Sequence, residues 1–373
     1  MKKRLGDYIQ EYSVRNKSGE DIPVYSITNS QGFCRDYFSK EVASKDKTSY
    51  KIVPRGCFAY NPSRINVGSV DWQRDEERVI VSPLYNVFSV SPEIDQQYLY
   101  YYLKSSATSY RIKEVATGSV RDNLRLSMLY DFMIELPSLD VQRQIVSNLD
   151  LLASIIRQRN QQLTKLDELI KARFVEMFGT YPDNPFGWNT GKIQDVVSNV
   201  RYGSSRPAVE GGKYPYLRMN NITYAGELDL TDTKRIDVPD SELDKCTVQR
   251  GDVLFNRTNS KELVGKTCVY NRDDMMVLAG FVIRVRVNER ILPEFLVAFL
   301  NTAFSKQMLL GMCKTAIGQA NINAKEMQNI GLYIPPIALQ EQFVDLKKQT
   351  DKSKLFAELF AQSTCILAEN RSK

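Results

Sequence analysis

Apolar residues recur at alternating steps of four and three residues along the stretch that follows Pro137. This spacing is the heptad pattern of a helix that packs along one seam against another helix. It predicts a long helix over about residues 138 to 178, ended by Gly179. The seam positions are Ile145, Leu149, Leu152, Ile156, Leu163, Leu166, Ile170 and Met177, with Arg159 and Arg173 as polar exceptions.

The same spacing returns near the end of the chain and predicts a second helix over about residues 337 to 370. Small residues in the middle of its seam would let a partner helix approach closely. Two long helices of matching pattern favour antiparallel packing against each other, although two unrelated core helices would show a similar pattern. The seam positions are Leu339, Phe343, Leu346, Thr350, Ser353, Ala357, Phe360, Thr364 and Leu367.

One phrase introduces both helices: ELPSLDVQRQIV at 135–146 and YIPPIALQEQFV at 333–344. The aligned pairs include Pro137 with Pro335, Gln142 with Gln340, Gln144 with Gln342 and Val146 with Val344, each at an offset of 198 (335 − 137). Upstream stretches match in the same order, which indicates a tandem repeat. They are RGCFAYN (55–61) with RGDVLFN (250–256), SPEIDQQYLYYYL (91–103) with LPEFLVAFL (292–300), TGSVRDNL (117–124) with IGQANIN (317–323), IPVYSITN (22–29) with YPYLRMNN (214–221), and RLGDYI (4–9) with GKIQDVV (191–197).

Each copy mixes short β-like runs, such as YKIVPRG and FVIRVRV, with a helix after Pro92 or Pro293. The predicted fold class is α+β, with two pseudo-symmetric globular α/β domains separated by two long antiparallel coiled-coil helices. The predicted parts are domain 1 at 1–137, a central spacer helix at 138–180, domain 2 at 181–335 and a C-terminal spacer helix at 336–373. A rigid spacer holding two basic domains apart would suit a gapped DNA site, because a duplex also has two-fold symmetry.

Composition narrows the chemistry. The 373 residues contain no histidine, which excludes histidine triads and histidine general bases, and the six cysteines form no C-x-x-C pair. We therefore expect no catalytic site, no metal site and reduced thiols in a cytoplasmic protein. The longest apolar run, MMVLAGFVI (275–283), is too short to span a membrane, and MKKR at the start is not followed by the apolar core of a signal peptide. The net charge of +6 permits a nucleic-acid partner without demonstrating one.

Polar loops between the β-like runs supply the candidate DNA-binding residues. Arginine can bond guanine with two hydrogen bonds, asparagine can do so with adenine, and serine can hold phosphate. Loops of this kind are also common as ordinary solvated turns. In the first domain the candidates are Arg15, Lys17, Asn29, Arg35, Lys45, Lys47 and Arg64. In the second they are Arg201, Ser204, Ser205, Arg206, Arg218, Asn220, Asn221, Arg257, Asn259, Ser260, Lys261, Gln319 and Asn321.

Three short stretches resemble catalytic motifs only in part. SKELVGKT (260–267) ends like a phosphate-binding loop, but Ser260 stands where the first glycine belongs and CVY follows in place of an evident helix. YNPSR (60–64) differs at its last two residues from the Asn-Pro-Pro-aromatic motif of amino-methyltransferases. PDSELDK (239–245) places its carboxylates too close together for a nuclease metal site, and we interpret it as a surface turn.

The whole pattern resembles the specificity subunit of type I restriction-modification systems. The resemblance rests on the duplicated LPSLDVQRQIV and IPPIALQEQFV junctions and on the second-domain phrases YGSS, YPYLRMNNI, GDVLFNRTNSKELVGK and IGQANIN. The first domain departs from these phrases, with VYSITNS in place of YLRMNNI and no RTNS.

This resemblance implies a chain without enzymatic activity, in which each domain recognises one half of a gapped double-stranded DNA target. The helices would dock two methyltransferase subunits that bind S-adenosylmethionine and methylate adenine, and a translocating restriction subunit can join that assembly. The chain itself would bind no cofactor. Two alternatives remain open: a restriction-modification enzyme fragment with cryptic methyltransferase or nuclease activity, and an interaction scaffold that meets no DNA.

Overall fold

The computed structural model describes residues 2–35, 46–116, 123–316 and 319–371, with side chains described outside 314–319 and 357–371. The chain divides into two compact units. One comprises the residues up to Ile156 with the last helical residues from Ala368, and the other comprises Arg157–Leu367. The long helix α4 (Leu139–Phe178) runs from the first unit into the second.

The first unit is built on a four-stranded antiparallel sheet in the order β2-β9-β6-β7, flanked by two-stranded ribbons. Phe58 and Phe88 lie opposite each other in the sheet and stack with ring centroids 5.2 Å apart. The strands are β1 (Lys2–Arg4), β2 (Ile9–Glu11), β3 (Ser26–Thr28), β4 (Gly32–Cys34), β5 (Lys51–Pro54), β6 (Phe58–Tyr60), β7 (Val70–Trp72), β8 (Arg78–Val81), β9 (Asn86–Val90) and β10 (Met133–Glu135).

Three short helices cover the core of the first unit: α1 (Gln96–Lys104), α2 (Ser106–Val115) and α3 (Leu126–Leu129). Helix α1 begins after Asp95, whose carboxylate accepts hydrogen bonds from the backbone N–H groups of Gln97 and Tyr98 at 2.9 and 3.0 Å. It then buries Leu99 and Leu103, which are four residues apart and therefore on one face.

The second unit contains a larger set of strands in three sheets and one ribbon. Its helices are α5 (Asp240–Cys246), α6 (Pro293–Leu300), α7 (Ala303–Met312), α8 (Ala324–Gln328) and α9 (Ile337–Arg371). Its strands are β11 (Asn189–Lys192), β12 (Val197–Tyr202), β13 (Tyr214–Leu217), β14 (Lys234–Ile236), β15 (Thr247–Val248), β16 (Val253–Asn256), β17 (Thr258–Asn259), β18 (Thr267–Val269), β19 (Met276–Leu278), β20 (Val282–Val287), β21 (Lys314–Ala316), β22 (Gln319–Asn321) and β23 (Gly331–Ile334).

The two units share one topology, as the repeat predicts. The sheet order β12-β20-β16-β18 in the second unit matches β2-β9-β6-β7 in the first. The ribbon β11–β23 likewise matches β1–β10, and the antiparallel pair β15–β19 matches β5–β8. A helix pair follows the last sheet strand in both, and a long helix follows the last ribbon strand. The predicted duplication of an α/β domain with its own long helix is confirmed.

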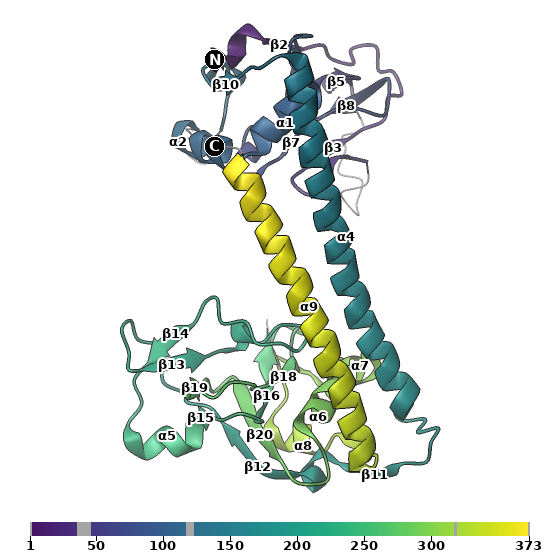
Figure 1. Cartoon of the computed structure of the whole chain (residues 1–373), viewed down its shortest axis with the longest axis vertical. Helices are drawn as coiled ribbons and strands as arrows, with labels where there is room; N and C mark the ends of the chain where they lie inside the picture. The colour runs from purple at the N-terminus through teal and green to yellow at the C-terminus, as the bar shows by residue number, and fades with distance from the viewer. Residues whose placement is uncertain (1, 36–45, 117–122, 317–318, 372–373) are drawn as a thin grey trace. The chain divides into compact units, whose positions relative to one another are not determined.

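The two predicted long helices are confirmed as α4 and α9, and within the second unit they run antiparallel (Figure 1). Phe174 of α4 and Phe343 of α9 meet edge to face at 5.2 Å, and Asp167, seven residues earlier in α4, forms an ion pair with Lys354, eleven residues later in α9. Residue numbers rise along one helix as they fall along the other. The predicted antiparallel pairing therefore holds for this stretch.

The predicted seam needs two corrections where the helices dock on the second unit. The deeply buried positions of α4 are Phe174 and Phe178, which were not placed on the seam, because a helix that also covers a domain core needs an apolar face wider than a heptad stripe. On α9 the predicted seam residue Ser353 is exposed, and Lys354 turns inward to its ion pair. The predicted positions Ala357, Phe360, Thr364 and Leu367 have side chains outside the described residues.

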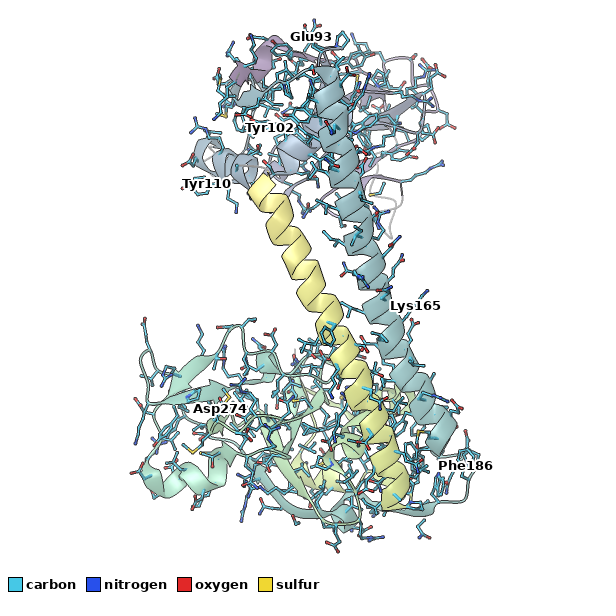
Figure 2. All side chains as sticks on the ribbon, in the orientation of Figure 1. Glu93, Tyr102, Tyr110, Lys165, Phe186 and Asp274 are labelled. Carbon is cyan, nitrogen blue, oxygen red and sulfur yellow. The ribbon has the colours of Figure 1, made fainter. Side chains whose placement is uncertain are left out.

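A buried glutamine fixes the start of each long helix to its domain. Gln142 accepts a hydrogen bond from the N–H of Asp95 and donates to the carbonyls of Pro137 and of Glu93, a residue labelled in Figure 2, all at 2.9 Å. Gln340 accepts from the N–H of Leu292 at 2.8 Å and donates to the carbonyls of Arg290 and Pro335 at 3.2 and 2.8 Å. Both side chains are fully buried.

The duplicated phrase therefore has a structural meaning. In each unit the glutamine links the helix to the segment that precedes the first domain helix of the repeat, α1 or α6. The other repeated glutamines, Gln144 and Gln342, are exposed. Each copy of the phrase thus contains one glutamine that is buried and hydrogen-bonded to the domain and one glutamine that is exposed at the surface.

Two sequence-based expectations about local structure have clear outcomes. The stretch 239–245 is not a surface turn but enters helix α5, because Pro239 precedes the helix and acidic residues in its first turn suit the positive end of the helix dipole. Among the described residues no single helix is long and apolar enough to cross a membrane; only α6 and α7 taken together, across a 70° bend, reach that length and composition. Helix α6 buries most of its side chains in the core of the second unit.

Candidate nucleic-acid interface

Arg257 is half-buried and lies directly after strand β16 in the second unit. Its backbone is held on both sides, because its N–H donates to the carbonyl of Phe281 at 3.0 Å and its carbonyl accepts from the N–H of Ile322 at 2.9 Å. Its guanidinium lies 4.9 Å from the ring centroid of Tyr202 and donates to Oδ1 of Asn321 at 3.2 Å. Its Nε is buried without a hydrogen-bond partner among the described residues.

Strand pairing brings other predicted residues to the same place. In the sheet β17-β22-β21, Thr258 lies opposite Asn321 and Asn259 lies opposite Ala320. Asn321, 64 residues from Arg257 in sequence, is therefore its direct neighbour. Ser260 is half-buried and Lys261 is exposed in the turn that follows β17. Gln319 belongs to β22, but its side chain lies outside the described residues.

The loop after β12 is joined to the turn between β19 and β20. The N–H of Ser204 donates to the carbonyl of Leu278 at 2.6 Å, and its carbonyl accepts from the N–H of Gly280 at 2.7 Å. Ser204 is therefore buried, whereas Ser205 is exposed. These two backbone hydrogen bonds place the Ser204–Ser205 loop beside the turn in which the carbonyl of Phe281 accepts from the N–H of Arg257.

Two arginines of the predicted set lie at or after the end of β12. Arg201 is exposed on the strand itself. Arg206 is also exposed, and its guanidinium pairs with the carboxylate of Glu242, Nη2 to Oε1, at 2.7 Å. The Glu242 carboxylate raises the pKa of Arg206, through their hydrogen bond first and their charge attraction second. Arg206 thus keeps its charge at the surface, already paired.

Arg218, Asn220 and Asn221 occupy one tight turn with different roles. Asn221 is 2% exposed; its oxygen accepts from the N–H of Arg218 and its amide donates to the carbonyls of Asp229 and Asp232. Arg218 forms an ion pair with Asp232 at 2.8 Å. Asn220 is exposed. Asn221 and Arg218 therefore hold the turn together, and Asn220 is the member of the three that faces solvent.

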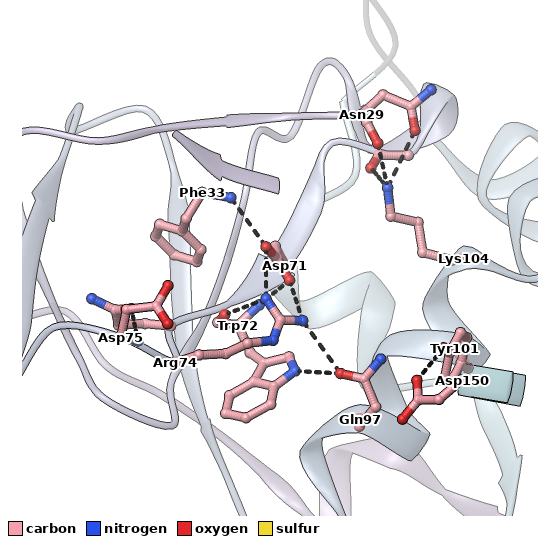
Figure 3. A network of polar contacts seen from close by, with 12 residues as sticks. Asn29, Phe33, Asp71, Trp72, Arg74, Asp75, Gln97, Tyr101, Lys104 and Asp150 are labelled. Atoms are coloured by element: carbon pink, nitrogen blue, oxygen red, sulfur yellow. Dashed lines mark hydrogen bonds and ion pairs between the residues drawn. The ribbon is translucent and has the colours of Figure 1, made fainter. Parts of the chain in front are cut away.

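In the first unit the predicted residues Asn29 and Arg64 line one polar cavity of about 860 Å³. Lys104 supports it from α1, donating from Nζ to the carbonyl and Oδ1 of Asn29 at 2.9 and 3.2 Å and to the carbonyl of Gly68 at 2.6 Å (Figure 3). Burial is the main cause that lowers the pKa of Lys104. The buried carboxylate of Asp71, drawn in the same figure, accepts from the N–H of Phe33 and pairs with Arg74.

The other predicted residues of the first unit are not among those lining this cavity. Arg15, Lys17 and Arg35 are exposed, and Lys47 is half-buried. Lys45 lies outside the described residues. Of the six predicted residues that the structure describes in the first unit, it thus groups two at this cavity.

Sequence reasoning missed Asn123 and Arg125, which line the same cavity. The N–H of Leu124 donates to the carbonyl of Pro62 at 3.0 Å, in the way that Ile322 donates to Arg257 in the second unit. Asn123 therefore takes the place of Asn321, and Pro62 takes the place of Arg257. The alignment of TGSVRDNL with IGQANIN on their glycines sets Asn123 opposite Asn323, so the equivalence with Asn321 emerges only from the hydrogen bonds of the structure.

The stretches that partly resembled catalytic motifs have structural roles. Lys266 of SKELVGKT is buried and donates from Nζ to the carbonyl of Met219 at 2.9 Å, and strand β18 follows it directly. Asn61 of YNPSR caps its own turn, accepting from the N–H and hydroxyl of Ser63. No group of three or more potential metal-ligating side chains is found among the residues that the structure describes.

A separate apolar groove of about 720 Å³ lies on the paired helices of the second unit. Leu166 and Leu169 of α4 and Phe356 of α9 supply its apolar surface, and Lys165, labelled in Figure 2, is also among its lining residues. Leu169 is 45% exposed and Phe356 is 75% exposed.

Comparison with known proteins places this architecture in a family. The model of the type I restriction modification DNA specificity domain matches residues 6–165 and 185–359, one copy for each repeat found in the sequence. Because these two matches cover most of the chain, the protein belongs to that family.

Curated relatives are specificity subunits of type I restriction enzymes. The EcoKI specificity subunit of Escherichia coli (strain K12) is 23% identical over 66% of this chain and 56% of its own length. The StySPI specificity subunit of Salmonella potsdam is 22% identical over 67% of this chain and 57% of its own length. The chain thus spans little more than half the length of these two relatives.

A solved structure agrees in fold. A chain from a study of complex assembly and conformational transition of the type I R-M system superposes with a TM-score of 0.60 at 17% identity, covering 99% of this chain and 95% of that chain. The two repeated domains with their long helices are therefore an arrangement already known in a type I R-M system.

Proposed function

We propose that this protein is the DNA-recognition subunit of a type I restriction-modification complex. Each α/β domain binds one half of a gapped duplex target, and the long helices set the gap. The family match and the two curated relatives support this role. The observation that carries it furthest is the hydrogen-bonded pair Arg257–Asn321 in the second domain.

The pair has the chemistry of base recognition. Arginine and asparagine are the side chains that bond guanine and adenine edges with two hydrogen bonds each. Asn321 and Tyr202 hold the guanidinium of Arg257, so little side-chain freedom is lost when it binds. Ser205, Asn220 and Lys261 are exposed in loops of the same domain and are candidates for phosphate contacts.

In the first domain, the cavity of Asn29, Arg64, Asn123 and Arg125 serves the other half-site. Pro62 at the position of Arg257 changes the available hydrogen bonds there. The two half-sites are therefore expected to differ in base sequence, which is consistent with an asymmetric target.

The chain contributes recognition and no chemistry. Methyl transfer to adenine belongs to partner methyltransferase subunits that bind S-adenosylmethionine, two for each chain, and restriction subunits join the same assembly. The apolar groove of Leu166, Leu169 and Phe356 is the docking surface we assign to such a partner. This assignment is supported by the exposure of Leu169 and Phe356 on helices whose other faces are packed.

The test is duplex binding by the full chain assembled with its co-expressed methyltransferase. First, methylated adenines are mapped to define the target. Arg257→Ala is then measured against single-base variants of that target; loss of about 1–3 kcal/mol confined to one base pair indicates a base contact, while equal loss on every duplex indicates a phosphate contact. Arg257→Lys keeps the charge but not the two-pronged geometry, and should resemble alanine at a base contact.

Arg250 provides the matched control, because it is an exposed arginine paired with Asp273 at 2.6 Å and outside the cluster. Arg250→Ala should leave the base preference unchanged. Absence of salt-dependent duplex binding would favour the scaffold alternative, and methylation by the chain alone would favour the enzyme alternative. Identical binding by wild type and Arg257→Ala on all duplexes would remove Arg257 from the interface.

A further inference from the structure

The two domains share a turn with the same hydrogen bond and the same type of tip. In the first domain the turn runs from Ser82 to Tyr85 between β8 and β9, and the N–H of Tyr85 donates to the carbonyl of Ser82 at 3.0 Å. In the second it joins β19 to β20, and the N–H of Val282 donates to the carbonyl of Ala279 at 2.9 Å. The third residue of the turn is apolar in both.

These tip residues are Leu84 and Phe281, which are 78% and 53% exposed. A single exposed apolar side chain is ordinary in proteins and needs no explanation. Here the exposure recurs at topologically equivalent positions, while the identity changes from leucine to phenylalanine. A side chain retained for packing would be buried, so the recurrence points to a role at the surface.

Both tips lie among the candidate DNA-binding residues. The carbonyl of Phe281 accepts the hydrogen bond from the N–H of Arg257, and the N–H of neighbouring Gly280 donates to the carbonyl of Ser204. Leu84 lines the first-domain cavity together with Arg64 and Asn123. An apolar tip surrounded by cationic and amide side chains suits a partner that is anionic outside and apolar within, which describes a base pair inside its phosphate backbone.

We propose that Leu84 and Phe281 are equivalent apolar contacts to DNA, one for each half-site. Each tip presses on the apolar surface of a base, either the methyl group of thymine or the face of a base at an opened step. The difference between leucine and phenylalanine then contributes to the difference between the half-sites. This proposal rests on the proposed function and adds specificity-determining residues to it.

The experiment uses the full chain assembled with its co-expressed methyltransferase and the duplex target mapped for the wild type. Phe281→Ala and Leu84→Ala are compared with Met275→Ala and Met133→Ala, which truncate exposed apolar side chains at the opposite end of β19 and in β10. Each tip variant should bind about tenfold more weakly, because an apolar contact of side-chain size is lost. The control variants should bind as the wild type does.

Base analogues identify which apolar surface is touched. Uracil in place of thymine removes only the methyl group, and the fluorescent adenine analogue aminopurine brightens when its stack is opened. The response measured is the change in binding for uracil and the change in fluorescence for aminopurine. Each tip variant should abolish this response in one half-site and leave it unchanged in the other. A response of either analogue that depends on the tip supports the proposal.

Three outcomes separate the proposal from the function on which it rests. Wild-type assembly that shows no sequence preference contradicts the proposed function itself. Normal wild-type specificity with tip variants that behave as the methionine controls overturns the tip proposal alone. Tip variants that weaken all duplexes equally, with no analogue dependence, overturn it as well, because such a loss reflects the fold of the turn and not contact with a base.

Discussion

Replacing Gln340 tests how the long helix is fixed to its domain. Gln340→Ala removes three hydrogen bonds and leaves the N–H of Leu292 and the carbonyls of Arg290 and Pro335 without their partner in a fully buried place. At about 1 kcal/mol for each bond, the expected loss in the free energy of unfolding is about 3 kcal/mol. For a unit of this size that lowers Tm by about 6–12 °C.

The assay can be confined to the second unit. The chain has two tryptophans, Trp72 in the first unit and Trp188 in the second. In a Trp72→Phe background, the fluorescence of Trp188 reports thermal unfolding of the second unit alone. Gln342→Ala is the matched control, because Gln342 is the exposed glutamine of the same repeated phrase, and it should change Tm by less than about 1 °C.

Gln340→Glu adds a test of hydrogen-bond direction. A carboxylate can accept from Leu292 but faces two carbonyls, whereas the protonated acid can donate to one of them. Burial therefore raises the folded-state pKa above the ordinary value of about 4.3, so the stabilising contribution is present at low pH and lost as pH rises through the raised pKa. The variant should lie nearer to wild type at pH 5 than at pH 8. Equal Tm for the alanine variants of Gln340 and Gln342, or a Gln340→Glu variant whose Tm relative to wild type does not change with pH, would refute the claim that Gln340 fixes α9 to its domain.

Three further predictions follow from other parts of the fold. Burial, followed by the charges of Lys266 and Lys171, lowers the pKa of Lys306 from 10.5 to about 8. Lys306→Met should therefore stabilise the second unit by about 1–3 kcal/mol below pH 8, and this gain should shrink as pH rises toward 10.5. A difference in urea unfolding that does not depend on pH would contradict this prediction. Leu169→Asp should abolish co-purification of the methyltransferase while leaving Tm unchanged, since Leu169 is 45% exposed; retained co-purification would exclude the groove as the docking site. Inserting one matched heptad near Arg159 adds about 10 Å of helix, so methylation mapping should show a gap longer by about three base pairs with unchanged half-sites; an active variant with the original gap would show that α4 does not set it.

The sequence was most informative where periodicity and repetition carry the structure. The heptad spacing and the repeated junction predicted the bounds of α4 and α9 to within a residue or two, and the repeat predicted the duplication of the domain. The spacing failed at Phe174, because a helix that leaves a seam to cover a domain core follows the contour of that core. No heptad rule contains that information.

The polar loops were less predictable, since asparagine and arginine have the same chemistry inside a turn as at a base edge. Asn221 satisfies its amide within its own turn, while Asn321 lies beside Arg257, and only the three-dimensional pairing of β17 with β22 separates these cases. The same limitation hid Asn123. The sequence alignment set Asn123 opposite Asn323 and not Asn321, and the first domain lacks the arginine that draws attention to the second.

The central claim is that each domain recognises its own half of one target, and exchange of a domain tests it most directly. Residues 181–335 are replaced by the equivalent domain of another family member, the chain is co-expressed with its methyltransferase, and methylated adenines are mapped genome-wide. The account predicts a target in which one half-site is new, the other is unchanged and the gap is kept. A target in which both halves change, or neither does, would contradict it.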